Sequence, residues 1–207
     1  MNITFKINQP ESKAGFEWQL DQDINVFDGG KLIAKAELEI LTLNKHRDAA
    51  KSYQALEELG ATDWEIPLNL YFKNQNVTLE LCERLTIKPE SKKSAQHIMI
   101  EAISVLPEYR NKGIAKLLLA KIAQEYTKAQ SIWLMAMPMQ NFVDVAQCAD
   151  GQDKAYYSAL NLNEEQATSV SDFFLKAGFE QLTIDEALLV EALPYDLMIA
   201  TPSLLTE

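Results

Sequence analysis

A short basic segment that contains a glycine, Arg110-Asn-Lys-Gly-Ile-Ala115, has the composition of an anion site. It follows an apolar run at 97–105, which predicts a strand, and it precedes a stretch that predicts a helix over 116–128. The first backbone N–H groups of a helix have no partners inside the helix, and the peptide dipoles place partial positive charge there. The segment therefore predicts a turn whose amides, from Asn111 to Lys116, bind a pyrophosphate group.

Individual residues of this turn suit the same task. Gly113 allows a phosphate to approach the backbone closely because it has no side chain, and Ala115 is small enough to permit the same approach. Arg110 and Lys112 add positive charge at the rim. The alternative is an ordinary strand-to-helix turn in which Gly113 serves only for tightness, and the flanking strand and helix favour the anion site.

The elements that must position the turn follow from the spacing of apolar residues. Two strand-like runs, 16–20 and 32–43, flank the turn signal Asp28-Gly29-Gly30 and predict a long hairpin. Helices are predicted over 48–60, 116–128 and 166–177, and strands at 3–7, 97–105, 132–137, 181–184 and 195–200. Residues 69–85 fit either a helix or a strand, and the irregular segment 139–163 contains one short helical candidate at 153–160.

The quoted motif resembles the acetyl-CoA motif of the GNAT (acyl-CoA N-acyltransferase) superfamily, Arg/Gln-x-x-Gly-x-Gly/Ala. A second signature of that family, a helix that ends in Gly-Phe, resembles Asp172-Phe-Phe-Leu-Lys-Ala-Gly-Phe179. The order of predicted elements also agrees over about 96–200, the motif core, whereas residues 1–95 are similar only in general layout. The resemblance implies one GNAT domain over residues 1–207.

The family fold is α+β, with a splayed mixed sheet flanked by helices. The resemblance implies that the strands at 97–105 and 132–137 part to form a V, and that acetyl-CoA is the cosubstrate. Its pantetheine arm would pair with the backbone of Ile103, Ser104 and Val105, and its pyrophosphate would rest on the turn. The coenzyme residues implied in this way are Ile103, Ser104, Val105, Arg110, Asn111, Lys112, Gly113, Ile114, Ala115 and Lys116.

The reaction implied is direct acetyl transfer to a primary amine of a small molecule or peptide. Glu101 is the candidate general base or amine anchor, because many members of the family carry an acidic residue on this strand facing the cleft. Strand alternation predicts that Met99, Glu101, Ile103 and Val105 share one face. A wet cleft explains a charge among apolar neighbours, although an exposed face or a partner elsewhere explains it equally.

The general acid is a point of departure from the family. Many members carry Tyr four residues before the Gly of the Gly-Phe signature, but this chain has Phe174 there, which has no proton to donate. Tyr156 and Tyr157 are candidate replacements, and packing of the short helix at 153–160 is the alternative for this pair. Water, or another group, is a further source of the proton. The long segment 139–163 is expected to act as a lid or specificity element.

Composition restricts the partners. The 207-residue chain has a net charge of −11, which argues against a nucleic-acid partner and favours cationic amines, or serves only solubility. The N-terminus lacks the pattern of a signal peptide, no apolar run is long enough for a membrane span, and a cytoplasmic location is expected. His46 and His97 lack the spacing of metal ligands, so no metal is expected. Homodimers are common among such folds.

Two other functions fit the same motif. A protein that binds acetyl-CoA without turnover is suggested by Phe174. A toxin-type acetyltransferase that acts on aminoacyl-tRNA is a second alternative, because some members of the family have this activity. The acidic composition disfavours it.

Overall fold

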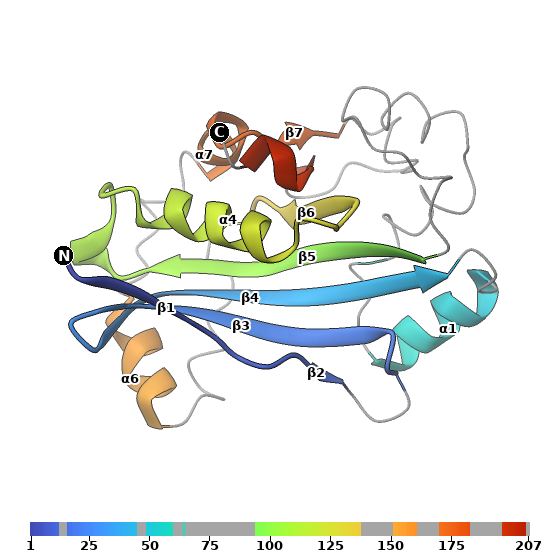
Figure 1. Cartoon of the computed structure of the whole chain (residues 1–207), viewed down its shortest axis with the longest axis horizontal. Helices are drawn as coiled ribbons and strands as arrows, with labels where there is room; N and C mark the ends of the chain where they lie inside the picture. Colours follow the sequence, from blue (N-terminus) through green and yellow to red (C-terminus); the bar gives the residue numbers. More distant parts are fainter. Residues whose placement is uncertain are drawn as a thin grey trace.

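The computed structural model describes residues 1–12, 16–44, 49–59, 64, 94–137, 151–160, 170–182 and 196–205. The strands of this part of the chain form an eight-stranded mixed sheet in the order β1-β3-β4-β5-β6-β8-β7, and the short β2 pairs with β3 (Figure 1). The strands are β1 (Ile3–Ile7), β2 (Glu11–Ser12), β3 (Gln19–Asp28), β4 (Lys31–Asn44), β5 (Ser94–Val105), β6 (Ser131–Met135), β7 (Glu180–Gln181) and β8 (Leu197–Ala200). The helices are α1 (Ala49–Leu59), α4 (Ile114–Glu125), α6 (Gly151–Ala159) and α7 (Val170–Lys176), with the 3-10 helices η3 (Pro107–Tyr109) and η6 (Pro202–Leu205).

The predicted long hairpin is confirmed as β3 and β4. Its first arm differs in extent, because β3 runs from Gln19 to Asp28 whereas the pattern predicted a strand at 16–20. Polar residues of β3 alternate with Ile24 and Val26, which are fully buried, as expected for a strand with one face in the core. Aspartate and asparagine are depleted in strands, and their frequency here hid most of β3 from sequence reasoning.

A bulge in β5 changes which side chains share a face. The register between β4 and β5 shifts at Glu101, which remains as an extra residue between Ile100 and Ala102. A bulge interrupts the alternation of a strand, so the predicted common face is wrong. Glu101 keeps a face with Met99, whereas Ile103 and Val105 move to the opposite face. The β5 residues that pack into the main apolar core are Ile98, Ile100, Ile103 and Val105.

Helix α4 lies over the core face of the sheet (Figure 1). Its buried side chains pack against apolar residues of β3, β4, β5, β6 and β8, and they are Ile114, Leu118, Leu119, Ile122 and Ala123. Full burial of an aliphatic side chain stabilises the fold by roughly 1.5–3 kcal/mol. Just beyond the helix, the Tyr126 hydroxyl donates a hydrogen bond to the Gln22 side chain on β3. These contacts fix α4, and therefore its N-terminus, relative to the sheet.

Strands β5 and β6 part after a short parallel ladder. Their pairing runs from His97 with Ser131 to Ile100 with Leu134. Beyond Ile100, β5 continues to Val105, and in the described residues it pairs there only with β4. The splayed mixed sheet expected from the sequence is therefore confirmed, and the last part of β5 has an open edge toward the gap.

The remaining boundaries follow the predictions closely. Helix α4 begins at Ile114, before the predicted start at 116, and α1 and α7 lie within their predicted ranges. The two closing strands are β7 and β8, and β8 lies between β6 and β7 in the sheet. The ambiguous residues 69–85 lie outside the described residues, as do 139–150 and 161–169. No helix in the described ranges is long and apolar enough to cross a membrane.

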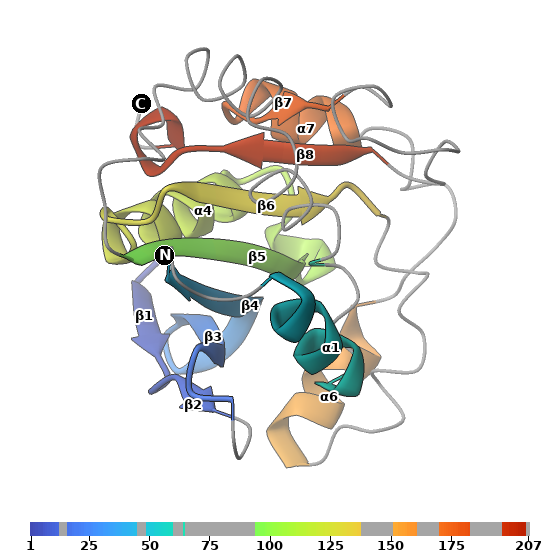
Figure 2. The same ribbon diagram turned by 90° about the vertical axis from the view of Figure 1, so that its right-hand side faces the viewer.

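The face of the sheet opposite α4 carries the other helices of the first half of the fold. Figure 2 shows α1 and α6 beside β3 and β4, away from α4. The indole Nε1 of Trp64, which is fully buried, donates to Glu39 Oε2 at 2.6 Å on this face of β4. This face differs from the core face in carrying charged and hydroxyl side chains of β3, β4 and β5.

A buried histidine on β5 is held in its neutral form. Trp133 Nε1 donates to Ser131 Oγ at 2.6 Å, and Ser131 Oγ lies 2.6 Å from His97 Nδ1. Because the Ser131 oxygen accepts from the indole, its own proton is available for Nδ1, as a neutral ring requires. Burial lowers the pKa of His97 to about 4 from an ordinary value of 6.5.

We predict that His97 makes the protein less stable as the pH falls from 6.5 to 4. In this window the unfolded chain binds a proton at His97 and the folded chain does not, so the free energy of unfolding decreases with falling pH. The full loss is about 3 kcal/mol. Urea unfolding at several pH values should show a weaker acid dependence for His97→Gln than for the natural chain. His46→Gln isolates the other histidine, and equal acid dependence in the natural chain and His97→Gln would refute the prediction.

Candidate functional site

The turn between β5 and α4 presents backbone amides at the N-terminus of the helix. Asn111 and Gly113 adopt left-handed conformations, with φ of 59° and 78°. Gly113 is the N-cap of α4 and makes no side-chain hydrogen bond there. Leu117 donates its amide to the Gly113 carbonyl at 2.9 Å, whereas no backbone acceptor among the described residues receives the amides of 111–116. The amides predicted to bind pyrophosphate are therefore available to a ligand.

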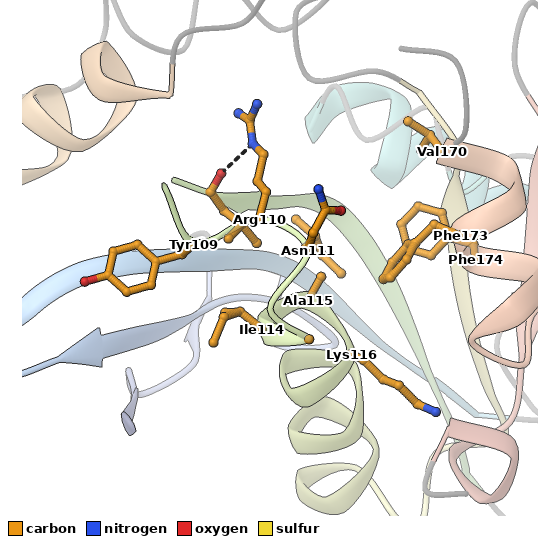
Figure 3. A pocket seen from close by; sticks show the side chains of 12 residues that line it. Tyr109, Arg110, Asn111, Ile114, Ala115, Lys116, Val170, Phe173 and Phe174 are labelled. Atoms are coloured by element: carbon orange, nitrogen blue, oxygen red, sulfur yellow. Dashed lines mark hydrogen bonds between the residues drawn. The ribbon is translucent and has the colours of Figure 1, made fainter. Parts of the chain in front are cut away.

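These amides border a pocket of about 450 Å³ (Figure 3). Its walls are the open end of β5, the turn with the start of α4, and one side of α7. The predicted coenzyme residues that line it are Ile103, Val105, Arg110, Asn111, Gly113, Ile114, Ala115 and Lys116. Ser104 and Lys112 are not among the lining residues, because Ser104 points to the other face of the sheet. The structure thus brings most of the predicted coenzyme residues into one cavity.

The third wall of the pocket comes from α7 and is apolar. Val170, Phe173 and Phe174 line it, and the Phe174 ring lies edge-on to Phe173 at 5.1 Å and to Phe179 at 5.5 Å between ring centroids. The spacing of these residues indicated one side of a helix but did not indicate a wall of the site. The Gly-Phe signature has a clear structural cause, since a Cβ at Gly178 would lie 2.7 Å from the Leu204 carbonyl oxygen.

Positive charge gathers at the mouth of the pocket although the chain as a whole is acidic. Lys116 lines the pocket, and Lys112 Nζ lies 5.2 Å from the centre of the Tyr109 ring. Lys31 Nζ, from the tip of the β3–β4 hairpin, lies 5.7 Å from the same ring and forms an ion pair of 2.6 Å with Glu108. Because of these cations the pocket mouth favours an anion, as the sequence predicted for this turn.

The side chain of Arg110 is committed to protein carbonyls. Its Nε donates to the Val105 carbonyl at 3.0 Å, and its terminal nitrogen donates to the Leu160 carbonyl at 2.7 Å. Figure 3 shows the guanidinium pointing away from Ile114, Ala115 and Lys116. The predicted contribution of this side chain, charge at the rim, is therefore accompanied by a structural contact that the motif did not reveal.

Glu101 lies at the bulge, next to the last residue of β5 that pairs with β6. It is partly buried. The gap between the two strands opens at this position, so Glu101 stands where the pocket side and the opposite face of the sheet meet. This location suits the predicted base or amine anchor, which stays a prediction.

Tyr156 and Tyr157 lie on α6, across the sheet from the pocket. The Tyr156 hydroxyl is 2.8 Å from Ser104 Oγ, and the Tyr157 hydroxyl donates to Glu37. Both rings pack with Leu160 in a small apolar cluster. The structure therefore does not bring this pair together with the pocket, and both residues take part in packing the short helix on the sheet.

A buried lysine holds the polar side of this contact. Lys35 Nζ lies 3.1 Å from Asp23, 3.3 Å from Glu37 and 3.7 Å from Asp153, and it donates to the Tyr157 hydroxyl at 3.2 Å. Its side chain is only 8% exposed. The sequence signal was the alternation of charges along 32–43, which equally fits a solvent-exposed face.

Burial and charge act in opposite directions on the groups of this cluster. Burial disfavours the charged form of Lys35, but Glu37, Tyr157 and Asp23 outweigh it and raise the Lys35 pKa. Burial raises the pKa of Tyr157, and the hydrogen bond and charge of Glu37 raise it further. Burial also raises the pKa of Tyr156. Lys35 is therefore charged and both hydroxyls are protonated at neutral pH.

Comparison with known proteins gives one family match. Residues 69–143 match the model of the acetyltransferase (GNAT) family. No curated protein matches the sequence. Among solved structures, the chain is similar to a bacterial toxin at 12% identity, over 89% of this chain and 69% of that one, with a TM-score of 0.43. It is similar to a mutant of KacT at 9% identity, over 99% and 98%, with a TM-score of 0.44. The corresponding values for arylalkylamine N-acetyltransferase 2 from Aedes aegypti are 17%, 87%, 73% and 0.38.

We predict that Lys35→Met destabilises the protein far more than Lys31→Met. Removal of the buried ammonium leaves Asp23 and Glu37 without their counter-charge, at a cost of about 3 kcal/mol. Lys31 is the matched control, because its ion pair with Glu108 is exposed to solvent and salt screening. Chemical denaturation at neutral pH measures both variants. Equal stability of the two variants would contradict the importance of the Lys35 cluster.

Proposed function

The chain belongs to the GNAT acetyltransferase superfamily, and on this premise we propose that it transfers the acetyl group of acetyl-CoA directly to a primary amine of a small molecule or peptide. The observation that carries the proposal is the pocket, in which the available amides of 111–116 lie beside the open edge of β5. Amides and cations at one end suit a pyrophosphate, and apolar walls at the other suit a pantetheine arm.

The residues of the pocket fit acetyl-CoA part by part. The amides around Gly113 and the charge of Lys116 would hold the pyrophosphate, with Lys112 at the rim. The edge of β5 from Ile103 to Val105 would pair with the pantetheine arm as an added strand, against Phe173 and Phe174. Bound in this way, acetyl-CoA supplies an activated thioester at the opening between β5 and β6.

Glu101 is the residue proposed to deprotonate or anchor the acceptor amine. An amine attacks only in its neutral form, and a carboxylate at the opening between the strands can accept its proton directly or through one water. A backbone N–H at the open end of β5 would stabilise the charge that develops on the carbonyl oxygen. The chain thus contributes orientation, a proton acceptor and a hydrogen-bond donor.

The thiol of coenzyme A must regain a proton after transfer. Among the described residues that line the pocket, the only hydroxyl belongs to Tyr109, and it donates to Asp28 at 3.3 Å. For Tyr156 or Tyr157 to act as the acid, its hydroxyl would have to leave its partner on the sheet, Ser104 or Glu37. We therefore propose that water returns this proton.

A cationic acceptor is favoured by the charges on the face opposite α4. Asp23, Glu37 and Asp153 surround the single ammonium of Lys35, so this group carries an excess of negative charge. The three carboxylates are partly exposed, and their field would attract a protonated amine toward the opening between the strands.

Phe174 supports a second candidate, a protein that binds acetyl-CoA without turnover. The pocket wall that it forms has aromatic rings and offers no acid to the thiol. Release of free thiol from acetyl-CoA in the presence of a panel of amines separates the two functions. Amine-dependent release supports the transferase, and tight coenzyme binding without release supports the binding protein.

We predict that Gly113→Ala weakens binding of coenzyme A at least about tenfold. The substitution strains a residue with φ of 78° and places a methyl group where the phosphates approach. Gly30→Ala is the matched control, because Gly30 has φ of 88°, similarly open surroundings and a position outside the pocket. Calorimetric titration with coenzyme A measures both. Unchanged affinity in Gly113→Ala, or absence of binding to the natural chain, would remove the basis of the proposed function.

We predict that Glu101→Gln lowers the rate of acetyl transfer by about 100-fold or more, because the amide cannot accept the proton of the amine. Affinity for coenzyme A should stay close to that of the natural chain. The control is Glu108→Gln, an exposed acid in the loop after β5 that pairs with Lys31. Thiol release with saturating amine gives the rates. A Glu101→Gln enzyme as fast as the natural one would show that another group takes the proton.

A further inference from the structure

Arg110 joins two parts of the molecule that are far apart in the sequence. It begins the turn that carries the available amides, and its own amide donates to the Pro107 carbonyl at 3.2 Å. Its guanidinium reaches Val105, the last residue of β5, and Leu160, which follows α6. One side chain therefore connects the motif strand, the turn and the helix on the opposite face of the sheet.

The contact at Leu160 is well suited to hold a helix in place. Leu160 is 1% exposed, so its carbonyl needs a partner within the protein. The C-terminus of a helix carries partial negative charge, and a guanidinium there is favourable. A planar fork that spans two carbonyls also restricts geometry more than a single ammonium does.

The rest of α6 is attached to the same sheet by different groups. Asp153 and Tyr157 contact Lys35, and the Tyr156 hydroxyl meets Ser104 on β5. These contacts secure the body of the helix, whereas Arg110 secures its end. The end is therefore the part of α6 whose position depends on the turn.

We propose that Arg110 is a positioning residue that clamps the end of α6 to the end of β5, so that coenzyme binding at the turn also orders the helix on the acceptor face. The clamp itself follows from the geometry alone, and its link to coenzyme A rests on the proposed function. Because the guanidinium points away from the start of α4 (Figure 3), a phosphate at the amides can leave both carbonyl contacts intact.

Hydrogen exchange of the full chain without ligand tests the clamp. In Arg110→Gln the amides at the end of α6 should exchange about 10- to 100-fold faster, the effect of losing charged hydrogen bonds. Lys112→Gln is the matched control, because it removes the same charge from the same turn but Lys112 contacts Tyr109 instead of α6. Its α6 exchange should equal that of the natural chain. Buried amides of α4, near Leu118 and Ile122, serve as an internal reference for overall stability.

Arg110→Lys separates charge from geometry. A lysine keeps the charge but cannot span the two carbonyls as a fork, so α6 should exchange at an intermediate rate. Natural-like α6 exchange in Arg110→Gln, or an equal acceleration in Lys112→Gln, would overturn the clamp.

Repetition with saturating coenzyme A tests the link between the two sites. The coenzyme should slow α6 exchange in the natural chain and should have a smaller effect on α6 in Arg110→Gln, even where calorimetry shows that this variant is saturated. Equal slowing in both proteins would overturn the coupling. Failure of coenzyme A to bind the natural chain would refute the proposed function, and the ligand-free comparison would still decide the clamp.

Discussion

The arrangement depends on one constraint: β5 pairs with β4 along most of its length but with β6 only as far as Ile100. Past that point the edge of β5 needs partners that the sheet does not provide, because backbone N–H and C=O groups are costly to leave unpaired away from water. The bulge at Glu101 lies where this change occurs. It turns Ile103 and Val105 toward the pocket and leaves Glu101 at the opening between the strands.

The sheet then divides the chemistry between its two faces. On the core face, apolar contacts hold α4 so firmly that its N-terminal amides have a fixed direction, and the pocket forms between them and α7. The other face carries Lys35 with its carboxylates, and the hydroxyls of α6. An anionic coenzyme and a cationic acceptor have opposite electrostatic requirements, and a sheet that opens along one line allows each to be met separately.

Local sequence was sufficient wherever the signal lies in a few neighbouring residues. The turn at 110–115, the helix after it, the β3–β4 hairpin and the helix that ends at Gly178 all follow from period, turn residues and small side chains. The alternation expected through Glu101 failed because a bulge depends on how the register of β4 fits β5, and no residue of β5 alone indicates it. The contacts of Arg110 with Leu160 and of Tyr157 with Lys35 and Glu37 join residues far apart in the chain.

The sequence by itself determined the superfamily fold, the coenzyme turn and the identity of the residues around it, because these depend on backbone conformations that Gly113 and its neighbours permit. Only the tertiary structure decided which of those residues face the pocket, that Ser104 and both tyrosines lie across the sheet, and that the Arg110 side chain binds carbonyls. The physical reason is that a side chain takes its face from the register of its strand and its partner from the packing of distant elements. Both are properties of the assembled sheet.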